Sequence, residues 1–170
     1  MTTPGKHVLH TGCSGHPLPD YLAGCRETRC DIDPACNPDI VASITALGDI
    51  GQFDIVLCSH TLEHVYHHEV PVALAEFRRV LFDGGHVVIL VPDLEDVKPT
   101  NEIIGEAPGL QITGLDLIYG LSSCVAQSPH WAHKTGFTQQ TLTDAMTSAG
   151  FKAPTVKRIP YYNLLAVGVK

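Results

Sequence analysis

The stretch from Val8 to Pro19, VLHTGCSGHPLP, passes directly from an apolar run into a group of small residues. The apolar run is typical of a buried strand, and Gly12, Ser14 and Gly15 are typical of a tight turn after it. In a doubly wound sheet, glycine in the turn after the first strand lets the backbone approach a ligand closely. A plain strand-to-helix turn needs the same glycines, so the turn alone leaves both interpretations open.

Strands and helices alternate along the rest of the chain. We expect strands at 7–11, 27–31, 53–59 and 86–92, a short strand within 40–47, a short helix at 18–25, and longer helices at 69–81 and 138–150. The last stretch, TVKRIPYYNLLAVGVK, predicts two strands joined at Pro160. The connection is too short for a parallel crossover, so this pair should be antiparallel. The pattern predicts one domain over 1–170, an α/β three-layer α/β/α sandwich with a Rossmann-like, mostly parallel sheet and an antiparallel last strand.

The segment 93–127 is predicted to be irregular, because prolines and glycines interrupt it repeatedly. A loop of that length inside a compact domain usually closes over a site. We therefore expect a lid or substrate-binding insertion there.

Composition excludes several classes of partner. The formal net charge is −7 and there is no lysine or arginine run, which disfavours nucleic acid. No apolar stretch is long enough for a membrane span, and the N-terminal MTTPGKH lacks the pattern of a signal peptide, so a cytoplasmic location is predicted. The six cysteines form no CxxC pair and are predicted to be free thiols.

An acidic residue follows the second predicted strand in the segment RCDIDP. Asp31 comes about 20 residues after the glycine turn, the spacing at which a carboxylate accepts hydrogen bonds from ribose hydroxyls. Asp33 is a nearby alternative, and either residue could be an ordinary surface charge.

Four segments, in order, resemble the class I S-adenosylmethionine-dependent methyltransferases, specifically their small type-11-like branch. They are VLHTGCSGHPLPD, RCDIDP, FDIVLCSHTLEHV and EFRRVLFDGG. The resemblance spans 6–93 and resumes more loosely at HKTGFTQQTLTDAMTSAGF. It implies S-adenosyl-L-methionine as the cofactor and O- or N-methylation of a small-molecule acceptor.

The resemblance also implies a set of cofactor-binding residues: His10, Gly12, Cys13, Ser14, Asp31, Ile32, Ser43, Ser59, His60 and Leu62. Some positions depart from the family pattern. His10 replaces an acidic or asparagine residue, Ser43 replaces an aspartate that contacts adenine, and Asp83 replaces a proline. Ser14 replaces a glycine, and we expect it to fit with a negative φ.

Two histidines are the catalytic candidates. Methyl transfer needs a base only when the acceptor keeps its proton at neutral pH. His133 is the first choice for a base or substrate-orienting group and His60 the second, whereas His64 is expected to orient its loop.

His60 and His64 have a spacing that suits zinc in a helix, but no third ligand is evident, so no metal is predicted. Trp131 and Tyr119 are expected to line the acceptor site.

Two alternatives accompany the enzyme hypothesis. The departures at His10, Ser14 and Ser43 allow a catalytically silent module of the same fold that acts through a protein partner. A nicotinamide-dependent oxidoreductase is disfavoured, because the turn lacks the G-x-G-x-x-G pattern and the last strand is antiparallel. The apolar C-terminal strands are also compatible with a homodimer.

Overall fold

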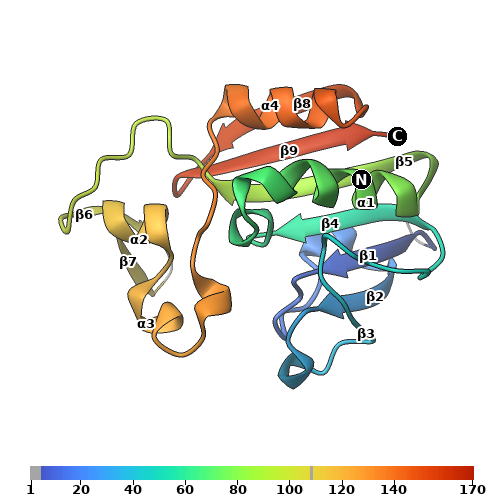
Figure 1. The fold of residues 1–170 in the computed structure, drawn as a ribbon, viewed down its shortest axis with the longest axis horizontal. Coiled ribbons are helices and arrows are strands. Elements are labelled where there is room, and N and C mark those ends of the chain that lie inside the picture. The colour runs from blue at the N-terminus through green and yellow to red at the C-terminus, as the bar shows by residue number, and fades with distance from the viewer. Residues whose placement is uncertain (1–4, 108) are drawn as a thin grey trace.

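The computed structural model describes residues 5–107 and 109–170 and is built around one large sheet (Figure 1). The seven strands follow the order β3-β2-β1-β4-β5-β9-β8. They are β1 (His7–Thr11), β2 (Arg26–Asp31), β3 (Ile40–Val41), β4 (Phe53–Ser59), β5 (Leu81–Pro92), β8 (Lys152–Ile159) and β9 (Asn163–Val169).

Strand direction in the sheet agrees with the expectation from the sequence. Strands β1 to β5 are mutually parallel, whereas β9 runs antiparallel to both β5 and β8. The chain leaves β1 toward β2 and β3 and returns to β4 on the other side, so the strand order reverses between β1 and β4. In such sheets ligands bind beyond the carboxyl ends of the strands at this reversal point.

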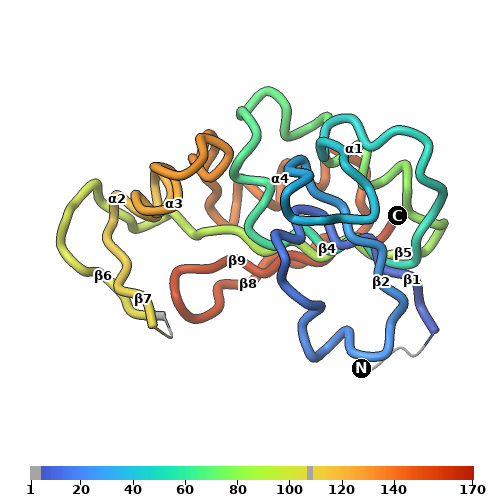
Figure 2. The backbone as a smooth tube through the Cα atoms, turned by 90° about the horizontal axis from the view of Figure 1, so that it is seen from below, coloured from blue at the N-terminus to red at the C-terminus, as the bar shows by residue number. Residues whose placement is uncertain are grey.

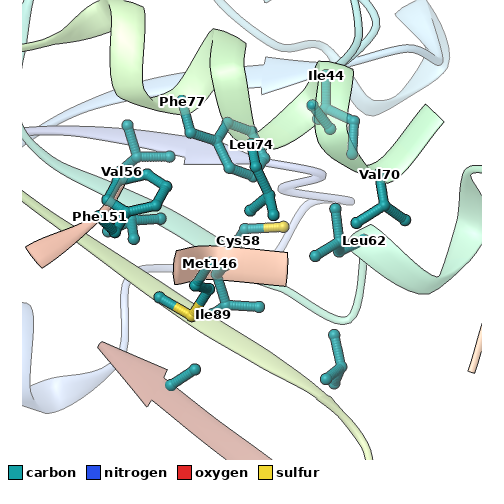
Figure 3. Packing of buried hydrophobic residues seen from close by; sticks show 14 of the residues in the cluster. Ile44, Val56, Cys58, Leu62, Val70, Leu74, Phe77, Ile89, Met146 and Phe151 are labelled. Atoms are coloured by element: carbon teal, nitrogen blue, oxygen red, sulfur yellow. The ribbon is translucent and has the colours of Figure 1, made fainter. Parts of the chain in front are cut away.

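Two helices, α1 (Val70–Val80) and α4 (Gln139–Ser148), cover one face of the sheet. The Thr138 hydroxyl accepts a hydrogen bond from the Thr141 amide at 3.2 Å and caps α4, as the sequence predicted. In Figure 3, Phe77 of α1 lies above the sheet and Met146 of α4 lies beside Ile89 of β5. These side chains are fully buried, so this face supplies the main hydrophobic core.

The opposite face carries no long helix among the described residues. A loop over 12–25 covers it beside β1 and β4, with one 3-10 turn at Asp20–Leu22 (Figure 2). The predicted helix at 18–25 is wrong. Pro17 and Pro19 have no backbone N–H, and Gly24 adopts a φ of +85°, so too few residues remain to nucleate a helix. The third layer of the sandwich is reduced here to this loop.

The segment 93–127 is more ordered than the sequence predicted. It forms the antiparallel pair β6 (Ile103–Ala107) and β7 (Leu110–Thr113), then α2 (Gly114–Tyr119) and α3 (Ser122–Val125). A capping box starts α2, in which the Thr113 hydroxyl donates to Asp116 Oδ2 at 2.7 Å and accepts from the Asp116 amide. The segment lies beyond the carboxyl end of β4 (Figure 1).

No helix in the described part of the chain is long and apolar enough to cross a membrane.

Candidate active site

The glycine turn after β1 packs directly against the loop after β4. Gly12 has a φ of +61°, and a Cβ at this position would overlap the Thr61 side chain. Only glycine fits for both reasons. Ser14 has a φ of +40°, so the expected negative φ is wrong. Its amide donates to Asp31 Oδ2 at 2.9 Å, and this bond accompanies the left-handed conformation.

Asp31 connects the turn after β1 with the loop after β2. Its side chain is 6% exposed. Oδ2 accepts from the Ser14 amide, and Oδ1 accepts from the Asp33 amide at 3.0 Å. Each carboxylate oxygen can accept two hydrogen bonds, so capacity remains for a ligand. Asp33 uses its own Oδ1 to accept from the Ala35 amide at 2.8 Å, which makes Asp33 a capping residue.

A cleft at the carboxyl ends of β1, β2 and β4 contains two cavities of about 250 and 90 Å³. Most of the residues predicted to bind the cofactor border these cavities or an adjoining cavity of about 390 Å³ on the side of the 12–25 loop. Gly12, Asp31 and Ile32 border both cleft cavities, Ser43 the larger, Ser14 and His60 the smaller, and His10, Cys13 and Ser59 the adjoining one.

Two predicted cofactor residues have side chains that are used elsewhere. Leu62 is fully buried in the core under α1 and borders none of these cavities, so its side chain is not available to a cofactor. His10 is 4% exposed, and its Nδ1 lies 2.7 Å from Glu27 Oε1. This pairing holds His10 in the wall of the adjoining cavity.

A separate cavity of about 340 Å³ lies under the segment formed by β7, α2 and α3; we call it the acceptor cavity. Its walls are mostly apolar, and its polar end is formed by the histidines and one glutamate after β4 and before α4. The lining residues are His60, Glu63, His64, Pro92, Leu110, Ile112, Asp116, Leu117, Leu121, Cys124, Trp131, His133, Tyr161 and Asn163. His60, His64 and Trp131 border both this cavity and the smaller cleft cavity, so the two spaces adjoin.

Backbone hydrogen bonds fasten the two segments that form the polar end. The Glu63 carbonyl accepts from the amides of Lys134 and Thr135 at 2.8 and 3.1 Å. The His133 amide donates to the Tyr119 carbonyl at 3.1 Å, which ties α2 to the same place. Residues far apart in sequence therefore meet in one fixed arrangement.

The histidine tautomers at the polar end follow from their partners. His64 Nδ1 lies 3.1 Å from the Ala132 carbonyl, and His133 Nδ1 lies 2.8 Å from the Leu117 carbonyl. A carbonyl oxygen only accepts, so both Nδ1 atoms donate, and in a neutral ring Nε2 is then left as an acceptor. Burial lowers the pKa of His133, and the nearby Glu63 charge opposes that shift. His133 is therefore neutral at pH 7 and able to accept a proton.

Glu63 was missed in the sequence analysis and is the most unusual residue of the site. It is 1% exposed, and neither carboxylate oxygen has a hydrogen-bond partner. His60 Nδ1 lies 3.3 Å from Oε1, within ion-pair distance but outside hydrogen-bond geometry. The position of Glu63 between His60 and His64 in SHTLEHV was the available signal, because the turn at Leu62–His64 brings all three to one place.

The catalytic candidates from the sequence, His133 and His60, both border the acceptor cavity. Trp131 borders it as expected, whereas Tyr119 is 62% exposed and does not. The backbone of His60 has a φ of +49° at the end of β4. Left-handed backbone at a non-glycine residue costs free energy and concentrates at functional sites.

The fold and the site can be compared with known proteins. Residues 9–89 match a family model described as a methyltransferase domain. No curated protein matches the sequence. Among solved structures, the chain is similar to the N-methyltransferase NodS of Bradyrhizobium japonicum in complex with S-adenosyl-L-homocysteine, with a TM-score of 0.60 and 17% identity over 98% of this chain and 79% of that chain.

Two further structures match at similar levels. Human N-acetylserotonin methyltransferase in complex with S-adenosylmethionine has a TM-score of 0.64 and 12% identity, over 97% of this chain and 47% of that chain. The S-adenosylmethionine-dependent methyltransferase SibL has a TM-score of 0.67 and 14% identity, over 98% of this chain and 50% of that chain. The chain spans about half the length of these two proteins.

The structural matches establish the fold, and the family model covers the strands that build the cofactor cleft. The matching family model covers just under half of the chain and is the one that the sequence motifs indicated, the type-11-like methyltransferase domain.

Proposed function

We propose that the chain transfers a methyl group from S-adenosyl-L-methionine to a small-molecule acceptor held in the acceptor cavity. The observation that carries this proposal is the junction of two spaces at His60, His64 and Trp131. One space has the features of a nucleoside site, and the other is apolar with one polar end. Donor and acceptor bound in adjoining spaces can meet there without crossing solvent.

The residues of the cleft fit the cofactor. The turn at Gly12 presents backbone without a side chain, and the carboxylate of Asp31 borders the same cavity with lone pairs to spare. We propose that Asp31 accepts hydrogen bonds from the ribose hydroxyls and that Ser43 and Ile32 border the adenine. The Ser43 hydroxyl is 2.8 Å from the Thr45 hydroxyl, so the two act as a polar pair at that end.

When bound, the cofactor supplies an electrophilic methyl group on a positively charged sulfur and leaves as neutral S-adenosyl-L-homocysteine. The protein has to orient the acceptor atom and remove its proton if it carries one. We propose that His133 Nε2 takes that proton, because Nδ1 is already protonated and burial favours the neutral ring. The adjacent Glu63 carboxylate then stabilises the imidazolium that forms, and His60 orients the acceptor at the junction.

The segment 93–127 is proposed to be a substrate-binding insertion within the single domain. Leu110, Ile112, Leu117, Leu121 and Cys124 all come from this segment and form the apolar wall of the acceptor cavity. A cavity of about 340 Å³ with such walls suits a small, largely apolar acceptor with one polar atom. Water is kept from the reacting atoms when the cavity is filled.

The test combines binding with turnover. Calorimetry with S-adenosyl-L-methionine and S-adenosyl-L-homocysteine should give one-to-one binding in the micromolar range. Incubation of the protein and methyl-labelled cofactor with a panel of small phenols, alcohols and amines should then give labelled product. No heat with either cofactor form would overturn the proposal, and cofactor binding without transfer to any acceptor would favour a silent module with a protein partner.

The homodimer and the cytoplasmic location stay predictions from the sequence. Light scattering during size-exclusion chromatography measures the oligomeric state, and fractionation of the source cells measures the location.

A further inference from the structure

We propose that Glu63, His64 and His133 form a binding site for a divalent transition-metal ion, with Zn²⁺ the expected occupant. One potential ligand atom from each residue lies within 4.8 Å of those of the other two. The ligands of a tetrahedral zinc ion stand about 3.3 Å apart, given metal–ligand bonds of about 2.0–2.1 Å. Small side-chain rotations are enough to close the difference.

The cluster is rich in hydrogen-bond acceptors, and the His60 Nδ1 atom, 3.3 Å from Glu63 Oε1, lies outside hydrogen-bond geometry. The Nδ1 atoms of His64 and His133 donate to backbone carbonyls, so each of these histidines turns only an Nε2 lone pair to its surroundings. The Glu63 carboxylate is buried and has no hydrogen bond. A buried carboxylate of this kind carries a large desolvation cost unless a cation, a proton or a donor of a ligand reaches it. The composition of the cluster thus favours a bound cation.

The outer hydrogen bonds of both histidines also fit a metal site. In metal sites, a ligating histidine usually donates its other ring N–H to a carbonyl or carboxylate, which fixes the tautomer and the ring orientation. The Ala132 carbonyl has this relation to His64, and the Leu117 carbonyl has it to His133. Both histidines are therefore oriented as metal ligands before any ion binds.

The combination of ligand types in the cluster also suits a metal ion. Two neutral imidazoles and one carboxylate, with a further position open, form a common catalytic zinc site and also suit related divalent transition ions. The open position would face the acceptor cavity, because all three residues border it. That position suits an acceptor with a hydroxyl or phenol oxygen. With the ion bound, His133 Nε2 would be a ligand and would not act as the base, so the proton transfer proposed for His133 applies to the ion-free protein; this last step rests on the proposed function. On the sequence alone, His60 and His64 had a spacing that suits zinc but no third ligand. The structure keeps His64 and brings Glu63 and His133 to it in place of His60.

The experiment uses untagged protein that has been stripped with a chelator and contains no cofactor or acceptor. Titration with Co²⁺ should give one-to-one binding with visible absorbance typical of nitrogen and oxygen ligands in low coordination, and Zn²⁺ should displace the cobalt. Calorimetry with Zn²⁺ alone should give the same stoichiometry. Absence of one-to-one binding of either ion would overturn the proposal.

Variants locate the site. Glu63→Gln and His133→Gln should each weaken Zn²⁺ binding at least 100-fold, since loss of a direct ligand should exceed the 10- to 100-fold effect of losing an outer partner. His67→Gln is the matched control, because His67 is an exposed histidine near the same segment and outside the cluster. Circular dichroism establishes that each variant is folded. Equal Zn²⁺ affinity in all three variants would place the ion elsewhere and overturn the assignment.

Calorimetry with S-adenosyl-L-methionine on the same samples separates this inference from the proposed function. Protein that transfers methyl groups but binds no ion overturns the metal site and leaves the function. Protein that binds the ion at the cluster but neither cofactor form overturns the function and leaves the metal site.

Discussion

Two buried carboxylates stand at the ends of β2 and β4, the strands on either side of β1, and their surroundings differ. Asp31 after β2 is 6% exposed, and backbone amides donate to both of its oxygens. Glu63 after β4 is 1% exposed, and neither oxygen is hydrogen-bonded. Asp31 is therefore part of the structure that holds the cofactor cleft open. Glu63 has no such support from the backbone, which is the reason that we propose a ligand for it.

The two sides of the site also differ in what builds them. The proposed cofactor side depends on backbone conformation, with Gly12 and Ser14 in left-handed conformations and the Ser14 amide bound to Asp31 Oδ2. The acceptor side consists of side chains, whose positions depend on bonds such as His133 Nδ1 to the Leu117 carbonyl. A cofactor site built from backbone tolerates substitution poorly at glycine. The acceptor site can change its chemistry through single side chains.

The largest expected effect is a loss of turnover, from a substitution in the acceptor cavity. His133→Ala removes the proposed base and should lower turnover by about 10²- to 10⁴-fold, the usual contribution of general base catalysis. Cofactor affinity by calorimetry should stay within about threefold of the wild-type value, because His133 does not border the cleft cavities. His67→Ala is the control and should keep full activity. Undiminished turnover in His133→Ala would exclude the residue from the chemistry.

On the cofactor side, Asp31→Ala should weaken S-adenosyl-L-methionine binding by about 1–3 kcal/mol, the range for a hydrogen bond to a charged group. The variant loses the proposed ribose contacts and also the anchor for the Ser14 amide. Asp33→Ala is the comparison, because Asp33 is half-buried, caps the following turn and borders only the smaller cleft cavity. Equal affinities of the Asp31→Ala and Asp33→Ala proteins would contradict the ribose role.

Isosteric amides test the comparison of the two carboxylates directly. Asp31→Asn should lower the free energy of unfolding by about 1 kcal/mol, because the bonds from backbone amides lose their charge assistance. Glu63→Gln should raise it by about 1 kcal/mol in metal-free protein, since a buried carboxylate without hydrogen bonds becomes an amide that can donate to an Nε2 atom. Urea denaturation at pH 7 measures both. Effects of the same sign would show that Glu63 has a structural partner.

Much of the fold was predictable because it depends on periodic patterns and loop lengths. The alternation of strands and helices predicted the parallel strands, and the short connection at Pro160 predicted the antiparallel pair. The helix expected at 18–25 failed because the flanking prolines outweigh a weak apolar pattern. The order within 93–127 was missed, although the capping box at Thr113 and Asp116 was visible in the sequence as a helix start.

The site was predictable only in part, because it joins segments far apart in the sequence. The family motifs located His60 and the glycine turn, and His133 came from the segment before α4. Glu63 was overlooked because burial and missing partners are properties of the folded chain. Leu62, its neighbour, was assigned to the cofactor, but its side chain lies in the core.

The smallest expected effect concerns the strain at the glycine turn. Ser14 has a φ of +40°, a region in which glycine has no steric penalty, whereas other residues lose about 1–2 kcal/mol. Part of the stability gained by removing this strain is offset, because glycine adds conformational freedom to the unfolded chain. Ser14→Gly should therefore raise the free energy of unfolding by about 0.5–1 kcal/mol, and its amide should still bind Asp31. Ser148→Gly at the exposed end of α4 is the control and should lower stability by about 0.5–1 kcal/mol. A loss of stability in Ser14→Gly would mean that the serine hydroxyl, 3.4 Å from Asp31 Oδ2, contributes more than the backbone strain costs.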